Sequence, residues 1–156
     1  MKISDFLRID AIATDLKSET KMDVIGEIVA MLVDAGIVEK KNKNKIVDGL
    51  MAREALGSTA IGQGIAIPHT KSDTVTGLIS ALAISKKGVK FDSLDGEPAY
   101  IIFLLIAPSD SAGPHLKALA RVSRLLKDKF FRDSLKNTKT AKDVMDLVSQ
   151  EDSRIG

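Results

Sequence analysis

The chain contains only two histidines, and each of them directly follows a proline. His69 comes after Pro68, and His115 comes after Pro114. Each proline–histidine pair lies just beyond an apolar run that predicts a strand. A single histidine after a proline is most often only a turn residue, so the hypothesis of a site depends on the pair. If the two strands are neighbours in one sheet, the two imidazoles converge at one edge.

Nucleophilic attack on phosphorus is the chemistry that these residues fit best. A neutral imidazole attacks phosphorus readily, and the phosphoramidate that forms is labile enough to pass its phosphoryl group onward. Such a site needs a cation and hydroxyl or N–H donors for the phosphoryl oxygens, and Arg53, Ser58 and Thr59 lie just upstream of His69. A helix N-terminus would keep His115 neutral. This placement assigns attack to His69 and support to His115, although the reverse assignment also fits the sequence.

Metal binding and serine hydrolysis are weaker alternatives. Because the chain has no cysteine and two histidines, a transition-metal site would need carboxylates, and the nearest are Asp73 and Asp110. A serine hydrolase built on Ser58 or Ser111 would lack the Gly-x-Ser-x-Gly elbow that exposes such a nucleophile.

A nucleotide-binding loop is a further alternative. Gly57 and Gly62 have the spacing that begins a phosphate-binding loop. That motif continues with Lys and then Ser or Thr, because the ammonium group holds the phosphates and the hydroxyl holds magnesium. Gln63 and Gly64 stand at those two positions, and a predicted helix rather than a strand precedes the loop. A metal- or nucleotide-binding domain is therefore kept only as an alternative.

The composition excludes several other classes of protein. The 156 residues include 23 basic and 21 acidic side chains, a balance that argues against a dedicated nucleic-acid binder. Five Phe, one Tyr and no Trp leave little for base stacking. Residues 1–10 form no secretory signal, and the longest apolar run, 99–108, is far too short for a membrane helix. We expect a single cytoplasmic domain with no nucleic-acid partner and no direct membrane insertion.

The elements that must position the two histidines can be predicted from the spacing of apolar residues. Helical spacing predicts segments 19–35, 46–56, 114–126, 130–135 and 141–148, with Ser18 as the first N-cap, Thr140 as the last and Gly36 and Gly57 as stops. Strands are predicted at 11–13, 64–67, 78–84, 89–91 and 100–106. We expect Pro68 to end the strand 64–67 and to leave His69 on a loop. Helices mixed with short strands favour an α/β sandwich.

The residues around the histidines also match a known pattern. Residues 56–69 read LGSTAIGQGIAIPH, Arg53-Glu54 stands before them, and residues 105–116 read LIAPSDSAGPHL. This set resembles the enzyme IIA domain of the fructose/mannitol class (type 2) in the bacterial phosphoenolpyruvate-dependent sugar phosphotransferase system (PTS). The resemblance spans essentially the whole chain, so residues 1–156 are expected to form a single domain of this type.

The resemblance implies a specific set of roles. His69 would be the phosphorylated residue, His115 the second active-site histidine and Arg53 the phosphate-binding cation. It also implies an α/β fold with a mixed sheet flanked by helices on both faces, phosphoryl transfer from the carrier protein HPr or its nitrogen-type paralogue, and no metal or nucleotide cofactor. Thr70 departs from relatives, which often have a smaller residue there, and the departure would affect docking rather than the nucleophile.

Two functional subgroups share this pattern. Fructose-type subunits pass the phosphoryl group to an enzyme IIB partner and then to sugar, as components of a phosphotransferase. Nitrogen-regulatory relatives instead bind a regulated kinase or channel protein, depending on whether the histidine is phosphorylated. Because no IIB or membrane domain is present in these 156 residues, the regulatory kind is favoured slightly.

A carrier that docks two partners on one face should present apolar side chains around its site. Ile61, Ile65 and Leu116 are the candidates for such a rim. Packing in the hydrophobic core is the simpler explanation for all three.

Overall fold

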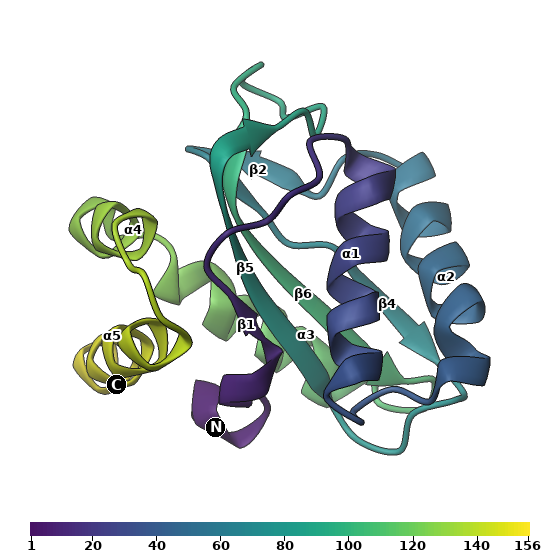
Figure 1. The fold of residues 1–156 in the computed structure, drawn as a ribbon. Coiled ribbons are helices and arrows are strands. Elements are labelled where there is room, and N and C mark those ends of the chain that lie inside the picture. The colour runs from purple at the N-terminus through teal and green to yellow at the C-terminus, as the bar shows by residue number, and fades with distance from the viewer.

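The computed structural model describes residues 1–156 and places a six-stranded mixed sheet between two groups of helices (Figure 1). The strands are β1 (Ile12–Ala13), β2 (Ala60–Gly62), β3 (Ile65–Ala66), β4 (His69–Ser72), β5 (Ile79–Val89) and β6 (Ala99–Pro108). The helices are α1 (Lys21–Asp34), α2 (Lys43–Ala55), α3 (Ala112–Leu125), α4 (Lys129–Lys136) and α5 (Ala141–Arg154). Short 3₁₀ turns lie at η1 (Ile3–Asp5), η2 (Ile9–Ala11) and η3 (Lys40–Asn42). The predicted α/β fold with a mixed sheet is confirmed.

The antiparallel pair of β5 and β6 forms the centre of the sheet. Beyond β5 lies the parallel strand β1. On its other side, β6 pairs in parallel with two short strands in succession, β3 beside Ile101 and Ile102 and then β4 beside residues 105–108. The strand β2 is antiparallel to β3. Residues 65–72 therefore follow β6 along its length, with a break between the two short strands.

This break corrects the prediction that His69 lies on a loop. Pro68 has no N–H to donate, so the ladder is interrupted there as expected. Its carbonyl oxygen still accepts a hydrogen bond from the N–H of Leu105 at 2.9 Å, and this bond brings the chain back onto β6. His69 is therefore the first residue of a new strand, with its Cα opposite that of Leu105.

Alternation along β6 explains why its sequence is apolar without interruption. Ile101, Phe103 and Leu105 belong to the core beneath α3, α4 and α5, whereas Ile102, Leu104 and Ile106 belong to the core beneath α1 and α2. Figure 1 shows these two groups of helices on opposite sides of the sheet. A strand covered on both faces buries every side chain, as a continuous apolar run indicates.

The strand predicted at 89–91 is wrong as a separate element. Strand β5 runs on to Val89 and its pairing with β6 is irregular between Ile84 and Val89. Gly88 has φ +92°, and a Cβ there would come within 2.9 Å of the Pro98 Cβ. The prediction ended the preceding strand at Ile84, because the irregularity and the exposed lysines just before Gly88 interrupt the apolar pattern of the strand.

Some helix ends differ from the prediction: α5 runs to Arg154 and not only to Val148, and the start of α1 has a different cap. The N-cap of α1 is Thr20 and not Ser18, because the Thr20 hydroxyl accepts the N–H of Asp23 at 3.4 Å. The N–H of Ser18 donates instead to the carboxylate of Glu27. Thr140 caps α5 as predicted. None of the helices combines the length and the apolar character that crossing a membrane would need.

Candidate active site

His69 is held by a hydrogen bond within its own segment. Its Nδ1 lies 2.8 Å from the carbonyl oxygen of Ile67. Because a carbonyl oxygen can only accept, this bond requires the proton to be on Nδ1. The lone pair of the neutral ring is then on Nε2. The backbone therefore selects the ring nitrogen that is able to attack an electrophile.

His115 lies next to His69, although the two residues are 46 positions apart in the printed sequence. The ring centroids are 5.5 Å apart, and the ring planes meet at 68°. His69 has the same orientation in the sheet as its partner Leu105, which faces the core beneath α3, and His115 is in the first turn of α3. The two imidazoles therefore converge, as the proline–histidine pairs predicted.

The environment of His115 favours the neutral ring. The side chain is buried, and its Nε2 has no hydrogen-bond partner. Burial lowers the pKa of His115 below its ordinary value, and the nearby His69 and Lys71 lower this pKa further. A neutral His115 was predicted from the helix N-terminus; the direction agrees, but burial is the largest cause.

The lowered pKa of His115 leads to a prediction about stability. The folded chain binds a proton on this ring at lower pH than the unfolded chain does, so acidification favours unfolding. The contribution is fully present above about pH 6.5, the ordinary value of a histidine, and is lost as the pH falls through the lowered pKa. We expect urea titrations to show a smaller free energy of unfolding at pH 5.5 than at pH 7.5, and His115→Gln to flatten this dependence.

His69→Gln is the matched control for that experiment, because it removes the other imidazole and should keep most of the slope. The aspartates whose pKa values are lowered titrate below about pH 4, outside this window. Equal pH dependence in wild type and His115→Gln would show that another group is responsible.

Arg53 lies on α2, which packs beside β4. Two contacts fix how these elements run past each other: Lys45 pairs with Asp73 at 2.7 Å, and Gly49 lies against Thr70. The helix and the strand are therefore antiparallel. Four helical residues rise about 6 Å and a strand rises about 3.3 Å per residue, so Arg53 is level with the start of β4. Its Nη1 donates to the carbonyl oxygen of Gly57 at 2.9 Å.

The hydroxyls of Ser58 and Thr59 already have partners. The Ser58 hydroxyl donates to the Phe91 carbonyl oxygen at 2.6 Å and accepts the Ala60 N–H. The buried Thr59 hydroxyl donates to the carboxylate of Glu54. Binding of a phosphoryl group by these two hydroxyls thus stays a prediction. Their segment is nonetheless next to the site, because the Thr59 carbonyl oxygen accepts the N–H of Ile67 at 3.1 Å.

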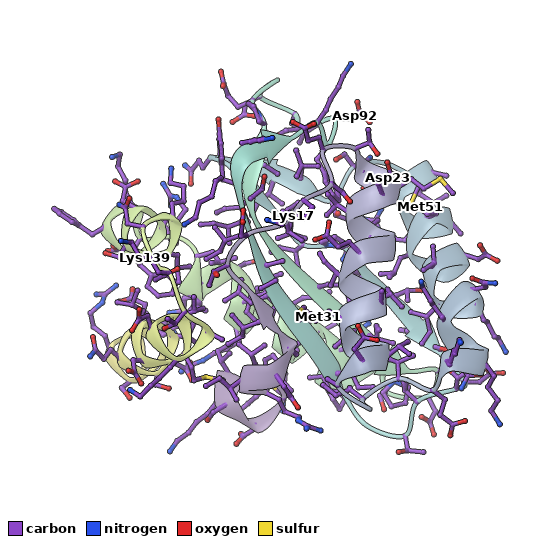
Figure 2. The ribbon with its side chains drawn as sticks, viewed as in Figure 1. Lys17, Asp23, Met31, Met51, Asp92 and Lys139 are labelled. Atoms are coloured by element: carbon purple, nitrogen blue, oxygen red, sulfur yellow. The ribbon has the colours of Figure 1, made fainter.

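Glu54 is a residue whose position sequence reasoning did not foresee. Its buried carboxylate accepts from the N–H and the hydroxyl of Thr59 and pairs with Lys21 at 3.1 Å. Lys21 also pairs with Asp92 at 3.5 Å, and Figure 2 shows Asp92 above the first turn of α1. The ammonium partner and the hydrogen bonds offset the cost of burying this carboxylate, which would be large if it were unpaired. It joins the end of α2, the start of α1 and the segment before β2.

Two of the three candidates for the apolar rim are exposed, and their place around the imidazoles stays a prediction. Ile61 is 53% exposed and Leu116, next to His115, is 68% exposed. Ile65 is only 2% exposed and is part of the core, which agrees with core packing, the simpler explanation given for it. Leu56, which follows α2, is 84% exposed and was not predicted. Of these exposed side chains, only Leu116 adjoins one of the two histidines in the sequence.

A family model described as "Phosphoenolpyruvate-dependent sugar phosphotransferase system, EIIA 2" matches residues 5–151. The chain belongs to this family. Both fructose-type and nitrogen-regulatory proteins are among its relatives, and members of the family act as phosphoryl carriers. The family recognised from the two histidine motifs is therefore confirmed.

The relatives include both subgroups. The chain is 36% identical to the "PTS system fructose-specific EIIABC component" of Bacillus subtilis over 97% of its own length and 24% of that protein. It is 33% identical to the "Nitrogen regulatory protein" of Bradyrhizobium diazoefficiens over 96% of its own length and 95% of that protein. The chain thus spans about a quarter of the first relative and almost all of the second.

Solved structures give the same fold. Nitrogen regulatory protein IIA-Ntr from Neisseria meningitidis is 30% identical, with a TM-score of 0.84 over 94% of this chain and 98% of that one. The enzyme IIA of the Escherichia coli mannitol system, solved in complex with phosphorylated enzyme IIB, is 22% identical, with a TM-score of 0.78 over 93% of this chain and 99% of that one. The second likeness concerns the fold alone.

Proposed function

We propose that this EIIA protein accepts a phosphoryl group on Nε2 of His69 and either passes it to a partner protein or uses it as a regulatory signal. The observation that carries the proposal is the 2.8 Å contact between His69 Nδ1 and the Ile67 carbonyl oxygen. It holds the proton on one nitrogen and leaves the other as the nucleophile. A ring fixed in this way needs no rearrangement before attack.

The proposed transfer needs no reactant other than His69 and the phosphorylated donor. The Nε2 lone pair attacks the phosphorus, the bond between phosphorus and the donor breaks, and the electron pair of that bond stays with the donor. His69 then carries the phosphoryl group on Nε2 and the proton on Nδ1. The Ile67 carbonyl stabilises the positive charge that this ring acquires. A charged imidazolium is a good leaving group, so the same hydrogen bond favours onward transfer.

His115 and Arg53 have supporting roles in this proposal. The buried Nε2 of His115 has no partner in the protein, and a phosphoryl oxygen on the neighbouring His69 would provide one. Because the neutral ring of His115 is favoured, it can donate one hydrogen bond without placing a second positive charge beside the His69 ring. Arg53, level with the start of β4, supplies the cation for the oxygens that become most negative during transfer. Ser58 and Thr59 are proposed to act as secondary donors.

The family and the exposed surface support the choice of partners in this proposal. The donor is phospho-HPr or its nitrogen-type paralogue, and the acceptor is an enzyme IIB in the transport role. In the regulatory role the partner is a kinase or channel protein whose binding depends on phosphorylation. The exposed side chain of Leu116, which follows His115, is proposed to give apolar contact with the partner, with Leu56 and Ile61 as further candidates. Neither a metal nor a nucleotide is needed for the step.

A phosphotransfer assay tests the proposal. The chain is incubated with phospho-HPr carrying a labelled phosphoryl group, and we expect one acid-labile phosphoryl group per chain. Phosphohistidine is lost in acid whereas phosphoserine survives, so acid treatment separates the two kinds of product. Phosphorus–nitrogen coupling in an NMR spectrum would identify Nε2. A chain that takes up no acid-labile label from either donor contradicts the proposal.

The second stage of the assay separates the two roles. Transfer of the label from the isolated phosphoprotein to an enzyme IIB would support the fructose/mannitol type of sugar uptake. A stable phosphoprotein whose affinity for a kinase or channel differs from that of the unmodified chain would support regulation, the role favoured slightly here.

A further inference from the structure

Helix α2 approaches β4 most closely where Gly49 meets Thr70. A Cβ added to Gly49 would be 3.0 Å from the Thr70 Oγ1 and 3.6 Å from its Cγ2. A contact of 3.0 Å between a Cβ and a hydroxyl oxygen is tighter than ordinary van der Waals contact, so Thr70 or the helix would have to move by a few tenths of an ångström. The absence of a side chain at Gly49 therefore lets the helix lie at its present distance from the strand.

A glycine in the middle of a helix is normally less favourable than an alanine. Gly49 is in the interior of α2 and has no positive φ, so no turn or cap requires it. Gly26 in α1 offers a contrast, since a Cβ there would meet nothing within 4 Å. The contact with Thr70 supplies a reason in packing at Gly49.

The Gly49–Thr70 contact lies between the two ends of the α2–β4 interface. At one end, the Lys45 ammonium lies 2.7 Å from the Asp73 carboxylate. One helical turn beyond Gly49, at the other end, α2 carries Arg53, level with the start of β4. Because Arg53 is one helical turn beyond Gly49, a shift of α2 at Gly49 would also move Arg53.

We infer that the contact between Gly49 and Thr70 positions Arg53 relative to His69. Gly49 and Thr70 are thus positioning residues, which act on the reaction through Arg53 and do not touch the phosphoryl group. The inference rests on the proposed function, in which Arg53 binds the phosphoryl oxygens. It adds the statement that a residue pair outside the site sets how well this cation is placed.

Gly49→Ala is the direct test. Its Cβ must push Thr70 or α2 away by a few tenths of an ångström. Misplacing a catalytic group by about 1 Å costs on the order of 100-fold in rate, so we expect label uptake from phospho-HPr to slow about three- to tenfold. Gly26→Ala is the matched control, because it makes the same change in a helix without a new contact and should keep the wild-type rate. Circular dichroism and thermal unfolding check that both variants fold.

Two further variants separate positioning from general damage. Gly49→Ala combined with Thr70→Gly removes the conflict, and this pair should recover most of the rate relative to Thr70→Gly alone. Gly49→Ala combined with Arg53→Ala should be no slower than Arg53→Ala alone, because the displaced side chain is already absent. Merely structural damage would add to the loss in both backgrounds.

The outcomes distinguish this inference from the proposed function. If Arg53→Ala slows uptake and Gly49→Ala behaves like Gly26→Ala, the inference is overturned and the clamp stands. If Arg53→Ala leaves uptake unchanged, the role of Arg53 in the proposed function fails, and the inference fails with it. If Gly49→Ala does not fold, failure of the double variant with Thr70→Gly to recover folding and rate overturns the inference.

Discussion

Replacement of His69 by alanine is expected to abolish phosphoryl uptake. The substitution removes the only side chain whose nucleophilic nitrogen is oriented by the Ile67 carbonyl, and no other group in the proposed step forms the bond to phosphorus. We expect His69→Ala to take up no acid-labile label from phospho-HPr under conditions that label the wild type fully. The measurement is the stoichiometry of label per chain after complete reaction.

His115→Ala provides the comparison for this experiment. The neighbouring imidazole supports transfer in the proposal but does not carry the phosphoryl group. We therefore expect His115→Ala to reach full labelling at a lower rate, while His69→Ala does not become labelled at any time. Full labelling of His69→Ala would show that another side chain is the nucleophile. Full labelling of His69→Ala together with none in His115→Ala would reverse the roles of the two histidines.

Replacement of Arg53 by alanine is expected to have the second largest effect. Removing one preorganised group that stabilises developing charge commonly costs about 10²–10³ in rate, or about 3–4 kcal/mol. We expect Arg53→Ala to slow phosphoryl uptake from phospho-HPr by a factor in this range, with the final stoichiometry unchanged. Single-turnover kinetics with excess chain would measure the transfer step itself.

Arg124 offers a matched control for Arg53. It lies in the last turn of α3 as Arg53 lies in the last turn of α2, and it is exposed. Arg124→Ala should keep the wild-type rate. Arg53→Lys should fall between wild type and Arg53→Ala, because an ammonium group keeps the charge but loses the planar fork of donors. An unchanged rate for Arg53→Ala would mean that this side chain only satisfies the Gly57 carbonyl.

The sequence predicted the parts of the site that depend on local pattern. The apolar run of β6 and the proline–histidine pairs were enough to bring His69 and His115 to one place, because a buried strand and the helix after it have few ways to pack. The pattern of α2 likewise placed Arg53 in its last turn. These features depend on periodicity and on Pro and Gly signals, which a single sequence contains.

Features that depend on tertiary hydrogen bonds were not predictable in this way. His69 begins a strand because the carbonyl of Pro68 meets the N–H of Leu105, a contact that pattern alone does not show. The hydroxyl of Thr59 has a buried partner because Glu54 lies within a helix and faces inward. A carboxylate is normally assigned to the surface, so neither residue carried a signal of this pairing.

The hydrogen bond that selects Nε2 of His69 has a consequence for the proposed binding of different partner proteins. The hydrogen bond that fixes the tautomer runs to a residue only two positions earlier, and the proline between them has a restricted backbone. The tautomer of His69 is thus determined within residues 67–69 and does not depend on the surrounding surface. If partner proteins of different shape dock here as proposed, they can move the neighbouring side chains while the hydrogen bond keeps the same ring nitrogen available.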